Sequence, residues 1–348
     1  MNILILAGGL SPEREVSFTS GCRIATALIG RGHRVCLCDP YTGCDPDGKP
    51  PVYTADAIRP RRIGMKVPDL ATLKRESGRG ERRIAPGVME LCRTAEVVFI
   101  ALHGDIGEDG RLQAMLETEG IRHTGSGYAG CLLAMDKDIA KRLFREADIL
   151  TPDWVHCDLS RQTAETAAAH IEETVGYPCV VKPCSCGSSV GVSMAEDREE
   201  LMQALILAMQ YEGDIIAERR IQGREVTVSV LGGRVLPAVE IVPHEGFYDY
   251  ANKYQAGAVE ELCPARIALA EASALADAAR RGFDVLRLGG YARFDFILDK
   301  TGTAWCLEAN ALPGMTPTSL LPRAAAAIGM DYPSLCEEIL RLATEIPE

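Results

Sequence analysis

The sequence predicts an α/β protein with more than one domain. Its 348 residues exceed the usual size of a single hydrophobic core, so we expect two or three domains. Residues 2–9 form an apolar run that ends in Gly8-Gly9, and a helical pattern follows, which indicates the strand–turn–helix opening of an open α/β domain. Near the other end, residues 293–310 alternate apolar and polar side chains around a turn, which predicts a β-hairpin.

The composition excludes several classes of protein. A hydrophobic fraction of 47% is too high for a disordered chain, and a formal net charge of −12 disfavours a nucleic-acid surface. The longest apolar runs, such as 3–7 and 97–102, fall far short of the roughly 20 residues that cross a bilayer. The 13 cysteines include no Cys-x-x-Cys pair, and the first residues lack the basic segment of a secretory signal. We therefore expect reduced thiols in the cytoplasm, with neither membrane nor nucleic-acid partners.

The N-terminal part predicts three buried strands, at 2–7, 34–39 and 96–102, with a helix that begins near Glu13. Open α/β sheets bind ligands at the carboxyl edge of their strands, where Glu15 and His103 would lie. Glu15 could bind a substrate ammonium or only complement the helix dipole, and His103 could contact substrate or be structural. Gly8-Gly9 is not the Gly-x-Gly-x-x-Gly pattern, which disfavours NAD binding.

Residues 41–87 predict a solvated insertion. They are rich in proline, glycine and charge, with ten lysines and arginines against six acids, and they show no sustained periodicity.

The middle of the chain combines helices with a glycine- and serine-rich loop. Residues 129–147 have a helical pattern with Lys137 and Lys141 on the polar side, and a domain boundary is expected near 125. A strand at 178–183 then leads into the loop, which lacks the P-loop pattern. Its backbone N–H groups could still close over phosphates, with Lys182 supplying charge, or it could be a flexible hairpin without a ligand. A second boundary is expected near 217, and the aromatic-rich segment 244–264 could be a lid or a surface loop.

The hairpin predicts a metal site. Phe294, Phe296 and Leu298 fall on one face of its first strand, with Arg293 and Asp295 on the other. On its second strand we expect Trp305 and Leu307 on the apolar face and Glu308 and Asn310 on the polar face. If the turn pairs Leu298 with Thr303, Arg293 lies opposite Glu308, and Asp295 lies one diagonal step away, about 7 Å. Two carboxylates and an amide oxygen suit Mg²⁺ held with substrate phosphates, although an exposed ladder of ion pairs would have the same composition.

Six segments together resemble the D-alanine:D-alanine ligases of the ATP-grasp superfamily, over nearly the whole length. They are Gly-Gly-Leu-Ser-Pro-Glu-Arg-Glu-Val-Ser at 8–17, Ala-Leu-His-Gly and Gly-Glu-Asp-Gly within 101–110, Thr-Gly-Ser-Gly through Met-Asp-Lys at 124–137, Val-Lys-Pro and Gly-Ser-Ser-Val-Gly-Val within 181–192, Phe-Tyr-Asp-Tyr-Ala-Asn-Lys-Tyr at 247–254, and Glu-Ala-Asn through Leu-Pro-Gly-Met-Thr at 308–316. The resemblance implies a three-domain ATP-grasp fold with a Rossmann-like N-terminal domain at 1–125, a central domain at 126–217 and a C-terminal domain at 218–348.

The resemblance also implies a role for each matching residue. ATP would be bound by Lys137, Lys182, Ser188, Glu218, Ile221, Glu225 and Lys253. Two Mg²⁺ or Mn²⁺ ions would be bound by Asp295, Glu308 and Asn310. The first D-alanine and the lid would be oriented by Glu15, Ser188 and Tyr254, the oxyanion would be stabilised by Arg293 and the Gly314 N–H, and the second D-alanine would be bound by Ser319. The implied reaction joins two D-alanines through an acyl phosphate, for peptidoglycan precursors.

Three supporting positions depart from the family pattern, namely Cys186, Ala292 and Ala311. Two alternatives stay open. The second substrate could be D-lactate or D-serine, or the chain could be a nucleotide-binding regulator without turnover. A homodimer is implied by the resemblance alone.

Overall fold

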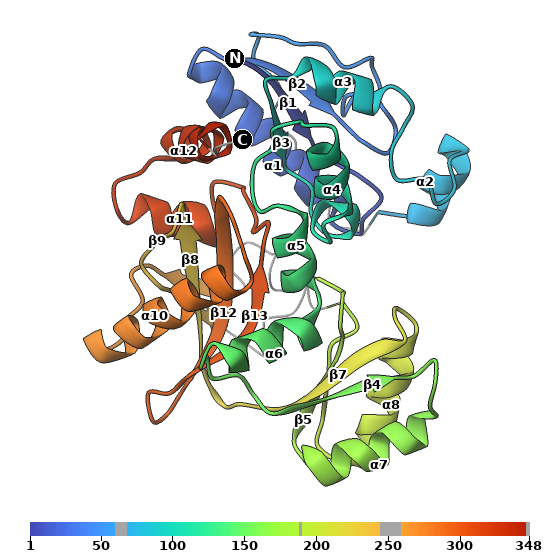
Figure 1. Ribbon diagram of the computed structural model, residues 1–348, viewed down its shortest axis with the longest axis vertical. Coiled ribbons are helices and arrows are strands. Elements are labelled where there is room, and N and C mark those ends of the chain that lie inside the picture. The colour runs from blue at the N-terminus through green and yellow to red at the C-terminus, as the bar shows by residue number, and fades with distance from the viewer. Residues whose placement is uncertain (60–67, 188–189, 244–258, 346–348) are drawn as a thin grey trace.

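The computed structural model describes residues 1–59, 68–187, 190–243 and 259–345. In this part of the chain the strands form three sheets. Figure 1 shows the N-terminal sheet at the top, the C-terminal sheet in the middle and the central sheet at the bottom. The mixed α/β class is therefore confirmed.

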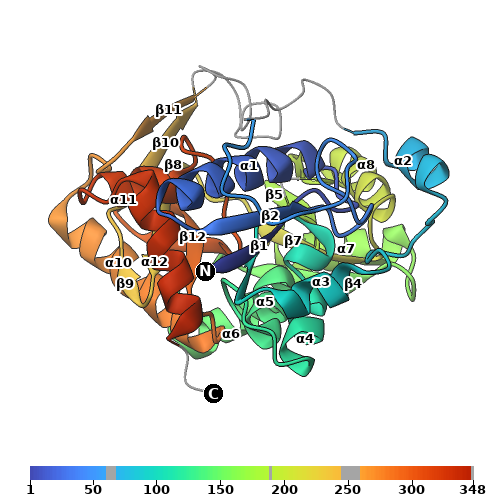
Figure 2. The ribbon, with the colours of Figure 1, turned by 90° about the horizontal axis from the view of Figure 1, so that it is seen from above.

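The N-terminal sheet is parallel, with the order β2-β1-β3. Its strands are β1 (Asn2–Leu6), β2 (Arg34–Cys38) and β3 (Val97–Ile100), and its helices are α1 (Arg14–Gly30), α3 (Val88–Thr94) and α4 (Arg111–Thr118), with a short 3₁₀ helix, η1, at Asp105–Gly107. The apolar residues of β1 are fully buried, which explains why this strand is a continuous hydrophobic run. The last helix, α12 (Tyr332–Thr344), packs against α1 and β3, so the end of the described chain returns to the N-terminal core (Figure 2).

The predicted insertion contains a helix that the sequence pattern did not indicate. Helix α2 (Leu70–Ser77) begins after Asp69, whose side chain accepts hydrogen bonds from the backbone N–H groups of Ala71 and Thr72. No residue of α2 is buried, so a core-facing stripe was not available as a signal. The cues in the sequence were the N-capping aspartate and Gly78, which ends the helix in the left-handed conformation.

The central sheet is antiparallel, with the order β4-β7-β5-β6. Its strands are β4 (Trp154–Asp158), β5 (Cys179–Pro183), β6 (Ser193–Ala195) and β7 (Asp214–Arg219). Helices α7 (Ala164–Thr174) and α8 (Arg198–Met209) pack on it and share one apolar core with it (Figure 1).

The C-terminal sheet has the order β11-β10-β8-β12-β13, with β9 paired to β8. Its strands are β8 (Gly223–Leu231), β9 (Arg234–Val235), β10 (Val239–Pro243), β11 (Val259–Leu262), β12 (Tyr291–Asp299) and β13 (Ala304–Asn310). Its core includes side chains of α10 (Leu269–Val285) and also of α5 (Tyr128–Met135) and α6 (Lys137–Glu146), which precede the central sheet in the chain. A further helix, α11 (Leu320–Ala326), contacts β8. The domain limits at 125 and 217 stay a prediction.

The helix predicted at 129–147 is two helices. The chain breaks at Asp136, whose side chain accepts a hydrogen bond from Ile139 N and caps α6. After the break, the side of the helix that was expected to face solvent faces the interior. Lys137 and Lys141 are buried, whereas Leu132 and Ile139 are exposed. The polar assignment of the two lysines was therefore wrong.

The predicted hairpin is present, but its register differs. Phe294, Phe296 and Leu298 are buried as expected. Asp295 lies opposite Glu308, and Arg293 lies opposite Asn310, so the predicted pairing of Arg293 with Glu308 is wrong. Two shifts of one residue each cause this difference: Leu298 pairs with Ala304 and not with Thr303, and a β-bulge after Asp295 adds one further residue to β13.

The bulge also changes which side chains of β13 face the core. Cys306 and Ala309 are the buried ones, whereas Trp305 and Leu307 are only partly buried. The prediction that Trp305 and Leu307 lie on the core face is therefore wrong.

A buried glycine in α10 tests the packing of this sheet. A Cβ atom on Gly282 would lie 2.6 Å from Cε1 of Phe294, whereas a Cβ on Gly30 of α1 would meet nothing within 4 Å. We expect Gly282→Ala to destabilise the protein by about 1–3 kcal/mol through overpacking, and Gly30→Ala to change stability by less than about 0.5 kcal/mol. Thermal unfolding followed by circular dichroism compares the two variants, and equal midpoints would contradict the packing of α10 on β12.

Candidate active site

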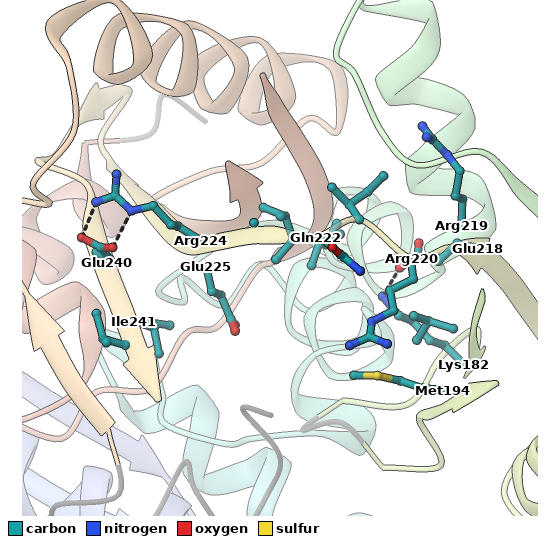
Figure 3. Close-up of a pocket in the computed structure, with 16 residues that line it drawn as sticks. Lys182, Met194, Glu218, Arg219, Arg220, Gln222, Arg224, Glu225, Glu240 and Ile241 are labelled. Carbon is teal, nitrogen blue, oxygen red and sulfur yellow. Dashed lines mark hydrogen bonds and ion pairs between the residues drawn. The ribbon is translucent and has the colours of Figure 1, made fainter. Parts of the chain in front are cut away.

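A pocket of about 450 Å³ lies between the central and C-terminal sheets. The connection from β7 to β8, residues 220–222, lines it together with side chains from both sheets. Figure 3 shows Glu218 and Lys182 on one side of the pocket, the Arg224–Glu240 ion pair on the other, and Glu225 between them. Four predicted nucleotide contacts, Lys182, Glu218, Ile221 and Glu225, therefore line a single pocket.

A buried carboxylate with two lysines forms one wall. Glu218 is 2% exposed, and its two oxygens lie 2.8 Å from Nζ of Lys141 and 2.5 Å from Nζ of Lys182. Burial alone would raise the pKa of Glu218, but the two lysines outweigh it and lower this pKa to about 2. The Glu218 carboxylate is therefore charged at neutral pH. Sequence reasoning missed Lys141, because a lysine four residues after Lys137 looks like a second polar position of the helix.

Lys137 connects the glycine- and serine-rich loop to the hairpin. Its Nζ donates hydrogen bonds to the carbonyl oxygens of Cys186, at 2.7 Å, and Cys184, at 3.4 Å. The same Nζ lies 3.9 Å from Oε2 of Glu308. The loop turns at Gly191, which has φ +72° and where a Cβ would lie 2.7 Å from Pro183. The structure thus brings Lys137, the loop and Glu308 together, as the resemblance implies.

The hairpin presents its predicted polar residues on adjacent positions. Arg293 makes two hydrogen bonds to the Asp295 carboxylate, at 2.7 and 2.8 Å. Asp295 faces Glu308 across the two strands, and Asn310 Oδ1 accepts a hydrogen bond from Leu312 N at 3.0 Å. Like charges directly opposite each other are unfavourable, so this pair of carboxylates depends on neighbouring cations.

The N-terminal edge contributes a second acidic cluster. His103 is buried, and its Nδ1 lies 3.8 Å from Oε1 of Glu108. A Cβ on Gly187 of the glycine- and serine-rich loop would lie 3.8 Å from both Glu13 Oε2 and Glu108 Oε2. Burial would lower the pKa of His103, but Glu108 and Glu13 raise it above its ordinary value. The loop backbone therefore lies against two acids and a histidine of the N-terminal domain.

Glu13, not Glu15, is the acid beside His103. Glu13 is the N-cap residue of α1, whereas Glu15 lies in the first turn, and the described contacts place only Glu13 at the His103–Gly187 cluster. Sequence reasoning singled out Glu15 and missed Glu13 and Glu108. The signal in the sequence was two acids separated by one residue at the start of the helix. The sequence pattern did not show which of the two would face His103.

The turn after β13 completes the edge. A Cβ on Gly314 would lie 3.0 Å from Ser319 Oγ, so these two predicted residues are adjacent. The backbone of Leu312, in this turn, also helps to raise the pKa of His103, so the turn lies beside the N-terminal edge. Ser188, Lys253 and Tyr254 lie outside the described residues, as do residues 244–258 of the segment predicted as a lid or surface loop, whereas residues 259–262 of that segment form strand β11.

Comparisons with known proteins agree over the whole chain. Two family models match, one described as D-ala D-ala ligase N-terminus at residues 2–126 and the other as D-ala D-ala ligase C-terminus at residues 143–341. The D-alanine--D-alanine ligase of Synechococcus sp. (strain JA-3-3Ab) is 39% identical over 346 residues, which is 99% of this chain and 94% of the relative. That of Anaeromyxobacter sp. (strain Fw109-5) is 40% identical and covers 97% of this chain and 95% of the relative.

Solved structures agree with this assignment. A D-alanine--D-alanine ligase from Bacillus anthracis has a TM-score of 0.77 at 27% identity, covering 99% of this chain and 97% of that chain. The VanG D-Ala:D-Ser ligase from Enterococcus faecalis has a TM-score of 0.78 at 27% identity, covering 98% and 99%. With both family models, the full-length relatives and the three-sheet fold in agreement, the chain belongs to the D-alanine–D-alanine ligase family and has its ATP-grasp fold.

Proposed function

We propose that this chain joins two D-alanine molecules to D-alanyl-D-alanine at the expense of ATP, for the synthesis of peptidoglycan precursors. One observation supports this most directly. In a chain of this family, the pocket between the two sheets has Lys182 on its wall, and Lys137 lies close to Glu308 of the hairpin. Nucleotide phosphates and the groups that neutralise them would thus meet at one place.

The nucleotide would lie along the pocket. Its base would contact Glu218 and the chain near Ile221, and its ribose would contact Glu225, which projects between the two walls (Figure 3). Its phosphates would reach Lys182 and Lys137, and Ser188 and Lys253 are proposed as further contacts. Lys137 and Lys182, which are both buried, would neutralise phosphate charge where charge interactions are stronger than in water.

Asp295, Glu308 and Asn310 would hold two Mg²⁺ or Mn²⁺ ions. The described residues contain no group of three His, Cys, Asp or Glu that could hold a metal alone, so nucleotide oxygens would complete the coordination. The donor set fits, because two facing carboxylates and an amide oxygen are hard ligands that need cationic partners. When bound, the ions would neutralise the charge that develops on the transferred phosphoryl group.

The chain's own groups would then guide the two steps. The first D-alanine carboxylate attacks the terminal phosphorus, ADP leaves, and an acyl phosphate forms. The amine of the second D-alanine attacks the acyl carbon, and phosphate leaves. Arg293 and the Gly314 N–H would stabilise the oxyanion of that step, and Ser319, which is adjacent to Gly314, would bind the second carboxylate.

The first D-alanine's ammonium is proposed to bind Glu13, in place of Glu15. Glu13 faces the His103–Glu108 pair and the backbone at Gly187, so a cation there would relieve a concentration of negative charge. Ser188 and Tyr254 remain proposed as its partners in orienting this substrate.

The cell compartment and assembly are also proposals. We propose a cytoplasmic homodimer, on the basis of the family and of the reduced thiols expected from the sequence. Within the described chain, no helix has the length and apolar character that crossing a bilayer requires.

D-serine is a second candidate for the acceptor substrate, because one structural neighbour is named a D-Ala:D-Ser ligase. The acceptor would approach the Gly314–Ser319 turn, where a few residues can change specificity. D-Lactate is the third acceptor to compare. A regulator without turnover is disfavoured, because pure nucleotide binding requires neither Arg293 nor the Gly314 N–H.

Phosphate release tests the proposed function. Purified chain, ATP and Mg²⁺ should release phosphate only when D-alanine is added, and mass spectrometry should detect the dipeptide. Adding D-serine or D-lactate with D-alanine then measures the choice of acceptor. Absence of D-alanine-dependent release would favour the regulator.

The first variant tests the hairpin. Glu308→Gln should reduce kcat by about 10³-fold or more, while ATP affinity falls only moderately, since the amide keeps the shape and loses the charge. Asp284→Asn, an exposed acid on α10, should keep full activity. Turnover near that of the unmodified chain in Glu308→Gln would remove Glu308 from the metal site.

A second pair of variants distinguishes the two acids of the first turn. Glu13→Gln should raise the KM for D-alanine about tenfold or more, because the charged contact to the substrate ammonium is lost, and Glu15→Gln should change it much less. Steady-state kinetics at saturating ATP measures both. The reverse order would restore Glu15 to the substrate site.

A further inference from the structure

Lys141 is a buried cation for which the proposed reaction has no task. It lies on α6 with 0% exposure, and its Nζ is surrounded by oxygens of three residues. It donates hydrogen bonds to Thr151 Oγ1 at 2.6 Å and Pro152 O at 3.3 Å, and it lies 2.8 Å from Glu218 Oε2. The Trp154 ring lies 5.3 Å away. An ammonium has three donors for three such oxygens, so the surroundings fit the charged form of Lys141.

The second lysine of the cluster, Lys182, differs from Lys141 because its side chain borders the pocket. Lys182 lies on β5, reaches the other oxygen of Glu218, and lines the pocket. Lys141 cannot reach the pocket, because it is fully enclosed and anchored to the 151–152 backbone and hydroxyl. The cluster thus contains two cations and one anion, and the cation that borders the ligand space is Lys182.

We propose that Lys141 is a positioning residue that stays paired with Glu218, so that Lys182 can leave Glu218 and bind a phosphate of the nucleotide. This inference rests on the proposed ATP-dependent function. With Lys141 in place, Glu218 keeps a partner when Lys182 moves. Without it, Glu218 and Lys182 form an isolated buried pair, and removing Lys182 would leave a buried carboxylate uncompensated, which is strongly unfavourable.

The other charges near Lys182 do not replace Lys141. Glu308 and Glu225 both interact electrostatically with Lys182 and raise its pKa together with Glu218, so they add negative charge to its surroundings. Lys137 is bound to the carbonyls of the glycine- and serine-rich loop, away from Glu218. Within the described residues, Lys141 is the cation that contacts Glu218 apart from Lys182.

A double-variant cycle tests this role. Lys141→Met, Glu218→Gln and the double variant are compared with the unmodified chain for ATP affinity by calorimetry with Mg²⁺. Lys141→Met should weaken ATP binding about tenfold, the size expected for coupling within one ion-pair network, and leave the KM for D-alanine unchanged. Glu218→Gln keeps an acceptor oxygen for the base and no longer holds Lys182. The double variant should therefore bind ATP as Glu218→Gln does.

A control removes a cation from the same helix. Arg142 is next to Lys141, but 64% of its side chain is exposed and it pairs with Asp138. Arg142→Met should bind ATP as the unmodified chain does, so a loss specific to Lys141→Met cannot come from lower positive charge on α6 alone.

Each outcome separates the inference from the proposed function. If the unmodified chain binds no ATP, both fail. If it binds ATP and Lys141→Met binds equally well, only the inference fails. If the double variant is as weak as Lys141→Met while Glu218→Gln binds well, Lys141 acts through packing and the inference is overturned. Circular dichroism shows whether Lys141→Met folds. If this single variant does not fold, the ATP affinities of Glu218→Gln and of the double variant are compared instead. Weaker ATP binding by the double variant than by Glu218→Gln would then contradict the inference.

Discussion

The buried carboxylate of Glu218 is the interaction on which the nucleotide side of the molecule depends. Its two lysine partners come from α6 and β5. Helix α6 contributes Ala140 and Phe144 to the core of the C-terminal sheet, whereas β5 and β7 belong to the central sheet with its separate core. One carboxylate therefore connects two hydrophobic cores at the wall of the pocket between them. Because a buried ion needs its partners, the relative position of the two sheets is tied to this contact.

The glycine- and serine-rich loop between β5 and β6 is surrounded by residues of all three domains. Lys137 holds its carbonyl groups from the start of α6 and also faces Glu308 on β13. Its backbone at Gly187 approaches Glu13 and Glu108 of the N-terminal domain. His103, which interacts with Glu13 and Glu108, also lies beside the backbone of Leu312 in the turn after β13. A displacement of any one sheet would therefore change the surroundings of the loop.

The sequence predicted those features that depend on burial and failed on those that depend on backbone detail. The alternation of Phe294, Phe296 and Leu298 identified the core face of β12 because strand periodicity follows burial directly. The register could not be predicted in the same way, because the pairing next to the turn is shifted by one residue, to Leu298 with Ala304, and the bulge adds another residue to β13 without a glycine or proline to mark it. The buried position of Lys141 was hidden for a related reason. Asp136 ends one helix and caps the next, and this break changes the phase of every position after it.

The local charge of the site, and not the net charge of the chain, decides what it can bind. The formal charge of −12 disfavours extended polyanions, whose binding needs a continuous basic surface. Surface charges are screened over about 8–10 Å at physiological ionic strength, whereas Lys137, Lys141 and Lys182 are buried and are screened much less. The charged side chains that line the pocket are four cations and three carboxylates, namely Lys182, Arg219, Arg220, Arg224, Glu218, Glu225 and Glu240, and Lys141 contacts Glu218 from behind, so the pocket wall has a small excess of positive charge. A small anion that reaches this wall is attracted more strongly than it would be in bulk water, because the effective dielectric constant there is lower. A long polyanion would instead be repelled by the net negative charge of the chain.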